Sequence, residues 1–214
     1  MSVRDPVVIV HGLWVHGVIM GLLKRRIAHC GFVAHAYSYP SMRLTLSENA
    51  ERLAQYCGRL GAPRIHIVAH SLGGLIALKM LETARGVHCG RLVLVGTPYS
   101  GSFAAARLSR FPGGTRLLGR SIAEWLSAPR PGISGADETG IIAGTRGFGL
   151  GSLIAPDLPR PNDGVVTLAE TQIPGVNRRV DLRVTHSQML VSRAVARQCC
   201  TFLRSGQFEL RPAA

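Results

Sequence analysis

A serine with small neighbours is the residue of this chain best suited to act as a nucleophile. Ser71 lies in the segment AHSLGG, after an apolar run at residues 65–69 and before a helical stretch at residues 73–85. The small residues Ala69 and Gly73 let strand and helix approach closely, so we expect a tight turn that presents the hydroxyl above a sheet. The start of the helix would also favour a developing anion. The alternative is a serine that only caps the helix, and the strand before it disfavours this.

A serine hydroxyl is a weak nucleophile near neutral pH and needs a base. His186 is the strongest candidate because it directly follows the strand predicted at residues 179–184. His11 and His70 lie at the same edge of the predicted sheet, but each adjoins a backbone feature and is expected to be structural. Other histidines lie within or beside elements away from this edge: His29, His35, His66 and His88.

The base in turn needs an acid that fixes its tautomer and stabilises the imidazolium. Asp163 lies in the turn sequence PNDGVV and precedes His186, which gives the chain order serine, acid, histidine. Asp157, which also has a proline nearby in the chain, is the alternative. We predict that Asp163 is the acid.

A second turn provides a place for the negative charge of a tetrahedral intermediate. The first apolar strand runs into the segment HGLW, in which the backbone N–H of Leu13 can point at the same spot as the N–H of Leu72. Two such donors form an oxyanion hole, and the loss of one typically costs about 3–4 kcal/mol of transition-state stabilisation.

These residues require a scaffold in which strands and helices alternate. Predicted strands cover residues 7–10, 32–37, 65–69, 91–95, 141–145 and 179–184. Predicted helices cover residues 15–30, 47–60 (with Thr45 or Ser47 as N-cap), 73–85, 103–110, 117–126 and 187–203. Such alternation indicates a parallel sheet covered by helices on both faces, with ligands at the carboxyl ends of the strands. The pattern breaks over residues 99–140, which we interpret as a surface excursion within one domain.

The segments HGLW, AHSLGG, GTPYSGS, NDGVV and THS occur in this order, and together they resemble the α/β-hydrolase superfamily, most closely its bacterial lipases and esterases. The resemblance covers nearly the whole chain. It implies Ser71 as nucleophile, Asp163 as acid, His186 as base, and Leu13 and Leu72 as oxyanion donors. It also implies a cofactor-free and metal-free enzyme. Tyr99 stands where these lipases usually carry a histidine.

The fold that this resemblance implies is an α/β fold of minimal size. The family's first two strands are missing from the sequence, so we predict a six-stranded parallel sheet of order 2-1-3-4-5-6 flanked by helices. One domain would span residues 1–214, with a short cap or lid at about residues 99–140.

Composition sets the remaining expectations. Hydrophobic residues make up 46% of the 214 residues and charged residues 17%, which excludes a disordered chain. The apolar runs are too short to span a membrane, and the start of the sequence does not look like a secretory signal, so we expect a cytoplasmic protein. Five cysteines without a CxxC motif predict neither a disulfide framework nor a zinc site, but reduced thiols.

The formal net charge of +13 has two interpretations. It can attract nucleic acid, an anionic membrane surface or an acidic substrate. It can also reflect a preference for arginine that only keeps the protein in solution, and this interpretation is favoured because the longest basic run has three residues. We expect no nucleic-acid partner, and we keep peripheral contact with an anionic membrane as an option.

The function that follows is hydrolysis of a small-molecule or lipid ester with an apolar acyl group, in lipid metabolism. Apolar residues in the excursion suggest an acyl chain, or they only pack this segment onto the sheet. Trp14, His70 and Tyr99 are candidates for the substrate pocket. The same triad would also serve a thioesterase or acyltransferase, and a third hypothesis is a binding protein without turnover. Acyl length, alcohol and oligomeric state stay open.

Overall fold

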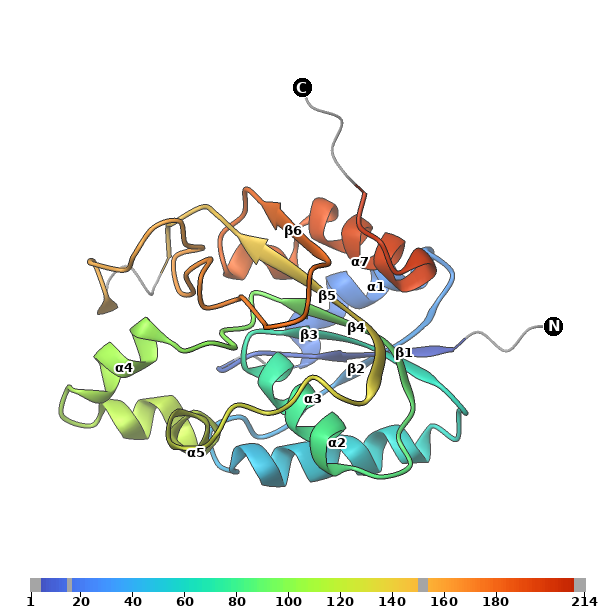
Figure 1. Cartoon of the computed structure of the whole chain (residues 1–214), viewed down its shortest axis with the longest axis horizontal. Helices are drawn as coiled ribbons and strands as arrows, with labels where there is room; N and C mark the ends of the chain where they lie inside the picture. Colours follow the sequence, from blue (N-terminus) through green and yellow to red (C-terminus); the bar gives the residue numbers. More distant parts are fainter. Residues whose placement is uncertain (1–4, 15–16, 150–153, 210–214) are drawn as a thin grey trace.

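Six parallel strands form the centre of the computed structural model, which describes residues 5–14, 17–149 and 154–209 (Figure 1). Their spatial order is β2-β1-β3-β4-β5-β6, and every neighbouring pair is parallel. The predicted fold class and strand order are thereby confirmed. The strands are β1 (Pro6–Val10), β2 (Val33–Tyr37), β3 (Ile65–His70), β4 (Cys89–Val95), β5 (Ala136–Gly144) and β6 (Arg179–Leu182).

Helices cover both faces of this sheet. In Figure 1, α2 and α3 lie below the sheet and α1 and α7 lie above it, while α4 and α5 gather at the end opposite the N-terminus. The helices are η1 (Gly17–Met20), α1 (Gly21–His29), α2 (Leu46–Arg59), α3 (Leu72–Thr83), α4 (Phe103–Ser109), α5 (Gly114–Ser127), η2 (Ser187–Leu190) and α7 (Arg193–Ser205). No helix in the described ranges is long and apolar enough to cross a membrane.

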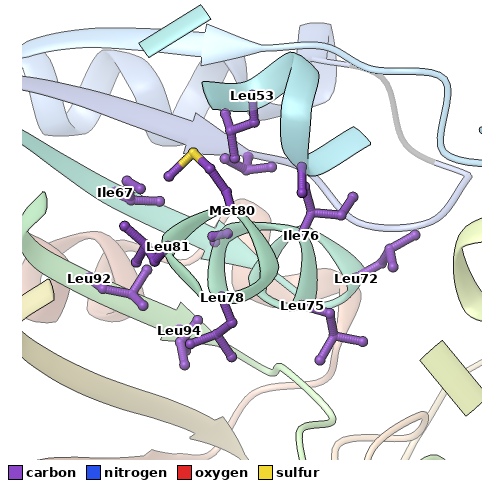
Figure 2. Packing of buried hydrophobic residues seen from close by; sticks show 14 of the residues in the cluster. Leu53, Ile67, Leu72, Leu75, Ile76, Leu78, Met80, Leu81, Leu92 and Leu94 are labelled. Atoms are coloured by element: carbon purple, nitrogen blue, oxygen red, sulfur yellow. The ribbon is translucent and has the colours of Figure 1, made fainter. Parts of the chain in front are cut away.

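The core consists of two apolar layers because successive strand residues point to opposite faces. In β1, Val8 and Val10 belong to the layer under α2 and α3, whereas Val7 and Ile9 belong to the layer under α1 and α7. Figure 2 shows α3 surrounded by its own leucines and isoleucine and by apolar residues of β3 and β4. Nine of the twelve residues of α3 are buried, so the helix that follows Ser71 is held firmly in the core.

Local signals explain where several helices begin. Thr45 caps α2 with a complete capping box, in which its side chain accepts from the N–H of Glu48 and the Glu48 carboxylate accepts from the N–H of Thr45. The helix predicted at residues 187–203 is divided instead. Its first turn is η2, and α7 starts afresh behind Ser192, whose hydroxyl accepts from the N–H of Val195.

Other predicted boundaries also differ from the structure. The helix predicted at residues 15–30 is a 3-10 turn followed by α1, and residues 15–16 lie outside the described part. Strand β5 starts five residues earlier than the predicted 141, because Cys89 to Leu92 of β4 pair with Ala136 to Thr139. Strand pairing across the sheet is a long-range interaction that a local pattern does not report.

The prediction of reduced cysteines is wrong for one pair. Cys30, at the end of α1, and Cys200, in α7, form a disulfide across a sequence separation of 170. The remaining three cysteines are free and buried: Cys57, Cys89 and Cys199. The bond ties together two helices that cover the same face of the sheet. In the described ranges no cluster of histidine, cysteine and carboxylate side chains could hold a metal ion.

Candidate active site

Ser71 occupies a strained turn between β3 and α3. Its backbone has φ 55° and ψ −125°, in a region that residues other than glycine rarely adopt and that costs about 1–3 kcal/mol. The N–H of Ser71 donates to the carbonyl oxygen of Val95 at 2.9 Å, which fixes the turn to the end of β4. Gly73 permits the tight approach, since a Cβ there would lie 2.7 Å from the carbonyl oxygen of Val10. Ser71 itself stays partly exposed.

His186 and Asp163 form a pair in which the carboxylate is buried and the imidazole is partly exposed. The Nδ1 of His186 lies 2.7 Å from Oδ2 of Asp163, whose side chain is 1% exposed. The other carboxylate oxygen accepts from the backbone N–H groups of Val165 and Val166, at 2.9 and 2.7 Å. Because a carboxylate only accepts, Nδ1 carries the proton and Nε2 is left as a free base.

The ends of β3 and β4 bring the serine turn and this pair to one edge of the sheet. Gly96 directly follows Val95, and a Cβ on it would lie 3.2 Å from Nδ1 of His186 and 3.3 Å from Oδ2 of Asp163. A side chain here would crowd both groups, and the φ of 57° also favours glycine. Among the described residues Ser71 Oγ makes no hydrogen bond to His186, whose imidazole is held by Asp163 through Nδ1.

The turn after β1 lies against the serine. A Cβ on Gly12 would be 2.9 Å from the Cβ of Ser71, so the N–H groups of Leu13 and Leu72 belong to two adjacent turns. Tyr39 fastens the first of these turns: its hydroxyl donates to the carbonyl oxygen of His11 at 2.7 Å, and its ring stacks on the His11 ring with centroids 4.2 Å apart.

The sequence analysis missed Tyr39 and Gly96. Tyr39 also donates its backbone N–H to Nε2 of His11 at 3.2 Å, so two hydrogen bonds and the ring stacking hold the turn that precedes Leu13. Nothing in the pattern around an isolated tyrosine predicts such contacts. Gly96 could have been found, because it begins the segment GTPYSGS directly after a predicted strand.

The three pocket candidates differ in position. Trp14 is 50% exposed and, together with residues 38–43, lines a groove of about 670 Å³. Tyr99 is buried, and its hydroxyl donates to the carbonyl oxygen of Pro131 at 2.9 Å, which fastens the 99–135 segment. The groove begins at Trp14, two residues after Gly12 of the turn that lies against Ser71.

His70 is buried next to the catalytic candidates. Its Nε2–H donates to the carbonyl oxygen of His186 at 3.2 Å, and the two rings lie 4.6 Å apart. Its Nδ1 has no hydrogen-bond partner among the residues that the structure describes. Burial, and then the neighbouring His186, lower the pKa of His70 well below its usual range, so this imidazole stays neutral.

Asp157, the alternative acid, lies elsewhere. Its side chain is 54% exposed and faces Arg107 at 4.0 Å. An exposed carboxylate of this kind contributes little to orienting a histidine. Asp163 is thus buried and paired with His186, whereas Asp157 is exposed and faces Arg107.

Comparison with known proteins identifies the family. A sequence model described as "Alpha/beta hydrolase family" matches residues 7–197. The chain belongs to this family. No curated protein matches the sequence.

Several solved structures share the fold of this chain. The mature lipase BlEst2 of Bacillus licheniformis is 17% identical with a TM-score of 0.68, over 95% of this chain and 92% of that protein. The ydeN gene product of B. subtilis is 18% identical with a TM-score of 0.67, over 94% and 100%. The metagenomic carboxyl esterase MGS0156 is 18% identical with a TM-score of 0.63, over 87% and 65%. At such identities the similarity concerns the fold alone.

Proposed function

We propose that this α/β-hydrolase cleaves carboxylic esters with an apolar acyl group through an acyl-enzyme on Ser71. The observation that carries the proposal is the pairing of His186 with the buried Asp163, at the same edge of the sheet as a serine held in a strained turn. A carboxylate on Nδ1 leaves Nε2 of the imidazole able to take a proton, which is the property that activates a serine hydroxyl.

The steps use groups already described. Oγ of Ser71 attacks the ester carbonyl carbon while Nε2 of His186 takes its proton, and the resulting oxyanion lies between the N–H groups of Leu13 and Leu72. The tetrahedral intermediate expels the alcohol, which receives the proton from His186. Water then attacks the acyl-enzyme with His186 as base again, and the acid is released.

The groove beside Trp14 supports the apolar acyl group. It begins two residues after Gly12, which touches Ser71, and Tyr39, Pro40 and Met42 supply apolar surface. We infer that the 99–135 segment, with α4 and α5, acts as a cap over this region, since the carbonyl of Leu117 in α5 accepts from the Trp14 indole.

A panel of nitrophenyl esters of graded acyl length tests the proposal. We expect turnover that rises with chain length and a loss of about 10⁶-fold in kcat for Ser71→Ala. A rate within tenfold of the original enzyme would remove Ser71 from the mechanism. A fluorophosphonate probe should label Ser71, as read from the peptide masses, and absence of labelling would favour a binding protein of the same fold.

The thioesterase alternative is tested with the same protein. We would conclude that the substrate is a thioester if kcat/KM is higher for an acyl-CoA than for a neutral ester. In that case kcat/KM for the acyl-CoA should also fall steeply as the salt concentration increases.

The cytoplasmic location stays a prediction, and the disulfide offers a way to check it. Disulfides are rare in a reducing cytosol. Trapping the thiols with an alkylating agent during cell lysis should give reduced Cys30 and Cys200 if the protein is cytoplasmic, whereas a fully oxidised pair would contradict this location.

A further inference from the structure

Three large apolar side chains are exposed together beside the start of α5. The exposed fractions are 50% for Trp14, 54% for Phe111 and 55% for Leu117. The Trp14 indole N–H donates to the carbonyl oxygen of Leu117 at 3.1 Å, and the carbonyl of Phe111 accepts from the N–H of Gly114, the first residue of α5. Exposed large apolar side chains gathered at one end of a helix mark an interaction site in many proteins.

Exposed arginines are close neighbours of Phe111 and Leu117 in the sequence. The segment 99–130 contains five arginines, no lysine and one acid, Glu124. Arg110, Arg116 and Arg120 are exposed and flank Phe111 and Leu117 in the chain. We call these three arginines, with Trp14, Phe111 and Leu117, the α5 patch.

Few carboxylates neutralise the α5 patch. Glu124 accepts hydrogen bonds from the N–H and hydroxyl of Ser47, so it is engaged at the start of α2. Glu48 lies 3.8 Å from Arg120 and is the acid that faces this group across the surface. Arg120 also donates to the carbonyl of Arg43, which places another exposed guanidinium beside the groove.

We propose that the α5 patch docks this protein on anionic phospholipid membranes. Tryptophan and phenylalanine favour the boundary between headgroups and acyl chains, and cationic side chains next to them are attracted by anionic headgroups. The phosphates of a nucleic acid could pair with the arginines, but Phe111 and Leu117 would stay exposed to water. Because Trp14 also lines the groove next to the serine turn, docking brings the membrane surface to the candidate active site.

Vesicle binding tests the proposal independently of catalysis, because the Ser71→Ala variant serves as the binding protein. The inference that the substrates are esters in the membrane rests on the proposed function, whereas the docking itself does not. We expect co-sedimentation with vesicles of phosphatidylcholine and phosphatidylglycerol, much weaker binding to phosphatidylcholine alone, and a loss of binding as salt rises from 50 to 500 mM.

Substitutions divide the patch into its charged and apolar parts. Arg116→Gln with Arg120→Gln should weaken binding to the anionic vesicles roughly 30-fold, given about 1 kcal/mol for each arginine at the surface. Arg59→Gln with Arg85→Gln removes the same charge from exposed positions at the other ends of α2 and α3, and should change binding less than about threefold. Equal losses in the two pairs would show that net charge alone drives binding and would overturn the proposal.

Fluorescence reports the apolar contact. The chain has two tryptophans, and Trp125 is fully buried, so a blue shift on adding anionic vesicles reports Trp14. Leu117→Ser should weaken binding at every salt concentration. If Leu117→Ser instead converts a dimer into a monomer and leaves vesicle binding unchanged, the patch is an interface between copies of the chain and the proposal fails.

Discussion

One carboxylate oxygen of Asp163 contacts His186, and the other accepts hydrogen bonds from backbone N–H groups of its own loop. An asparagine could still accept from the N–H groups of Val165 and Val166, but it would offer a donor to Nδ1 of His186 and stabilise the wrong tautomer. We therefore expect Asp163→Asn to lower kcat by about 10⁴-fold while the protein still folds, as measured with a nitrophenyl ester and by thermal unfolding. The control is Asp157→Asn, at an exposed site facing Arg107, which should leave kcat unchanged. A large loss in the control would disqualify the assignment of Asp163.

His70 should make stability depend on pH. Its pKa is lowered in the folded protein, so below about pH 6.5 the unfolded chain binds a proton that the folded protein does not. The free energy of unfolding then falls as pH decreases, with a slope of up to about 1.4 kcal/mol per pH unit from this group. Urea unfolding at pH 7.5 and 5.5 should show a smaller acid loss for His70→Gln than for the original chain. His29→Gln, at an exposed site, controls for removing a histidine, and an unchanged acid loss in His70→Gln would refute the idea.

The types and order of residues predicted which side chains to inspect, because a serine between a strand and a helix, and a histidine after a late strand, are local patterns. They did not predict the partners that hold them. The contact of Tyr39 with His11, and that of His70 with the carbonyl of His186, join segments 28 and 116 residues apart. Such contacts depend on where the loops pass, which no local spacing specifies.

Replacement by alanine should change the free energy of unfolding in opposite directions at two helical glycines. The comparison tests how closely the helices pack on the sheet. Gly58 in α2 is exposed and a Cβ there meets nothing within 4 Å, so Gly58→Ala should stabilise the protein by about 0.5–1 kcal/mol through helix propensity. Gly73 in α3 lies against the end of β1, so Gly73→Ala should destabilise by about 1–3 kcal/mol and lower kcat by moving the turn before Leu13. Urea unfolding measures both. A stabilised Gly73→Ala variant would mean that α3 does not pack closely on β1.

Elements with continuous apolar runs were predicted well because they are buried on both faces, as in β1 and β4. Elements whose ends depend on neighbours were predicted less well. Apolar residues recur at helical spacing throughout residues 187–203, but a new helix begins after Ser192. Apolar spacing does not predict the change of backbone conformation between η2 and α7.

At the scale of the molecule, the disulfide is the feature that sequence could not reveal. An odd number of cysteines without a characteristic spacing allows every pairing or none. Pairing of Cys30 with Cys200 requires α1 and α7 to cover the same face of the sheet, and this follows only from the completed topology.

The bond should stabilise the whole fold because it closes almost the entire described chain into a loop. With 170 residues between its ends, loss of loop-closure entropy in the unfolded chain predicts a stabilisation of up to about 5 kcal/mol. A reductant should therefore lower the melting temperature, and the double variant Cys30→Ala, Cys200→Ala should melt at the lower temperature with or without it. Alkylation of the unfolded, unreduced chain should modify three cysteines, and five after reduction. If five react without reductant, the two helices are not linked, and their packing alone holds that face of the sheet.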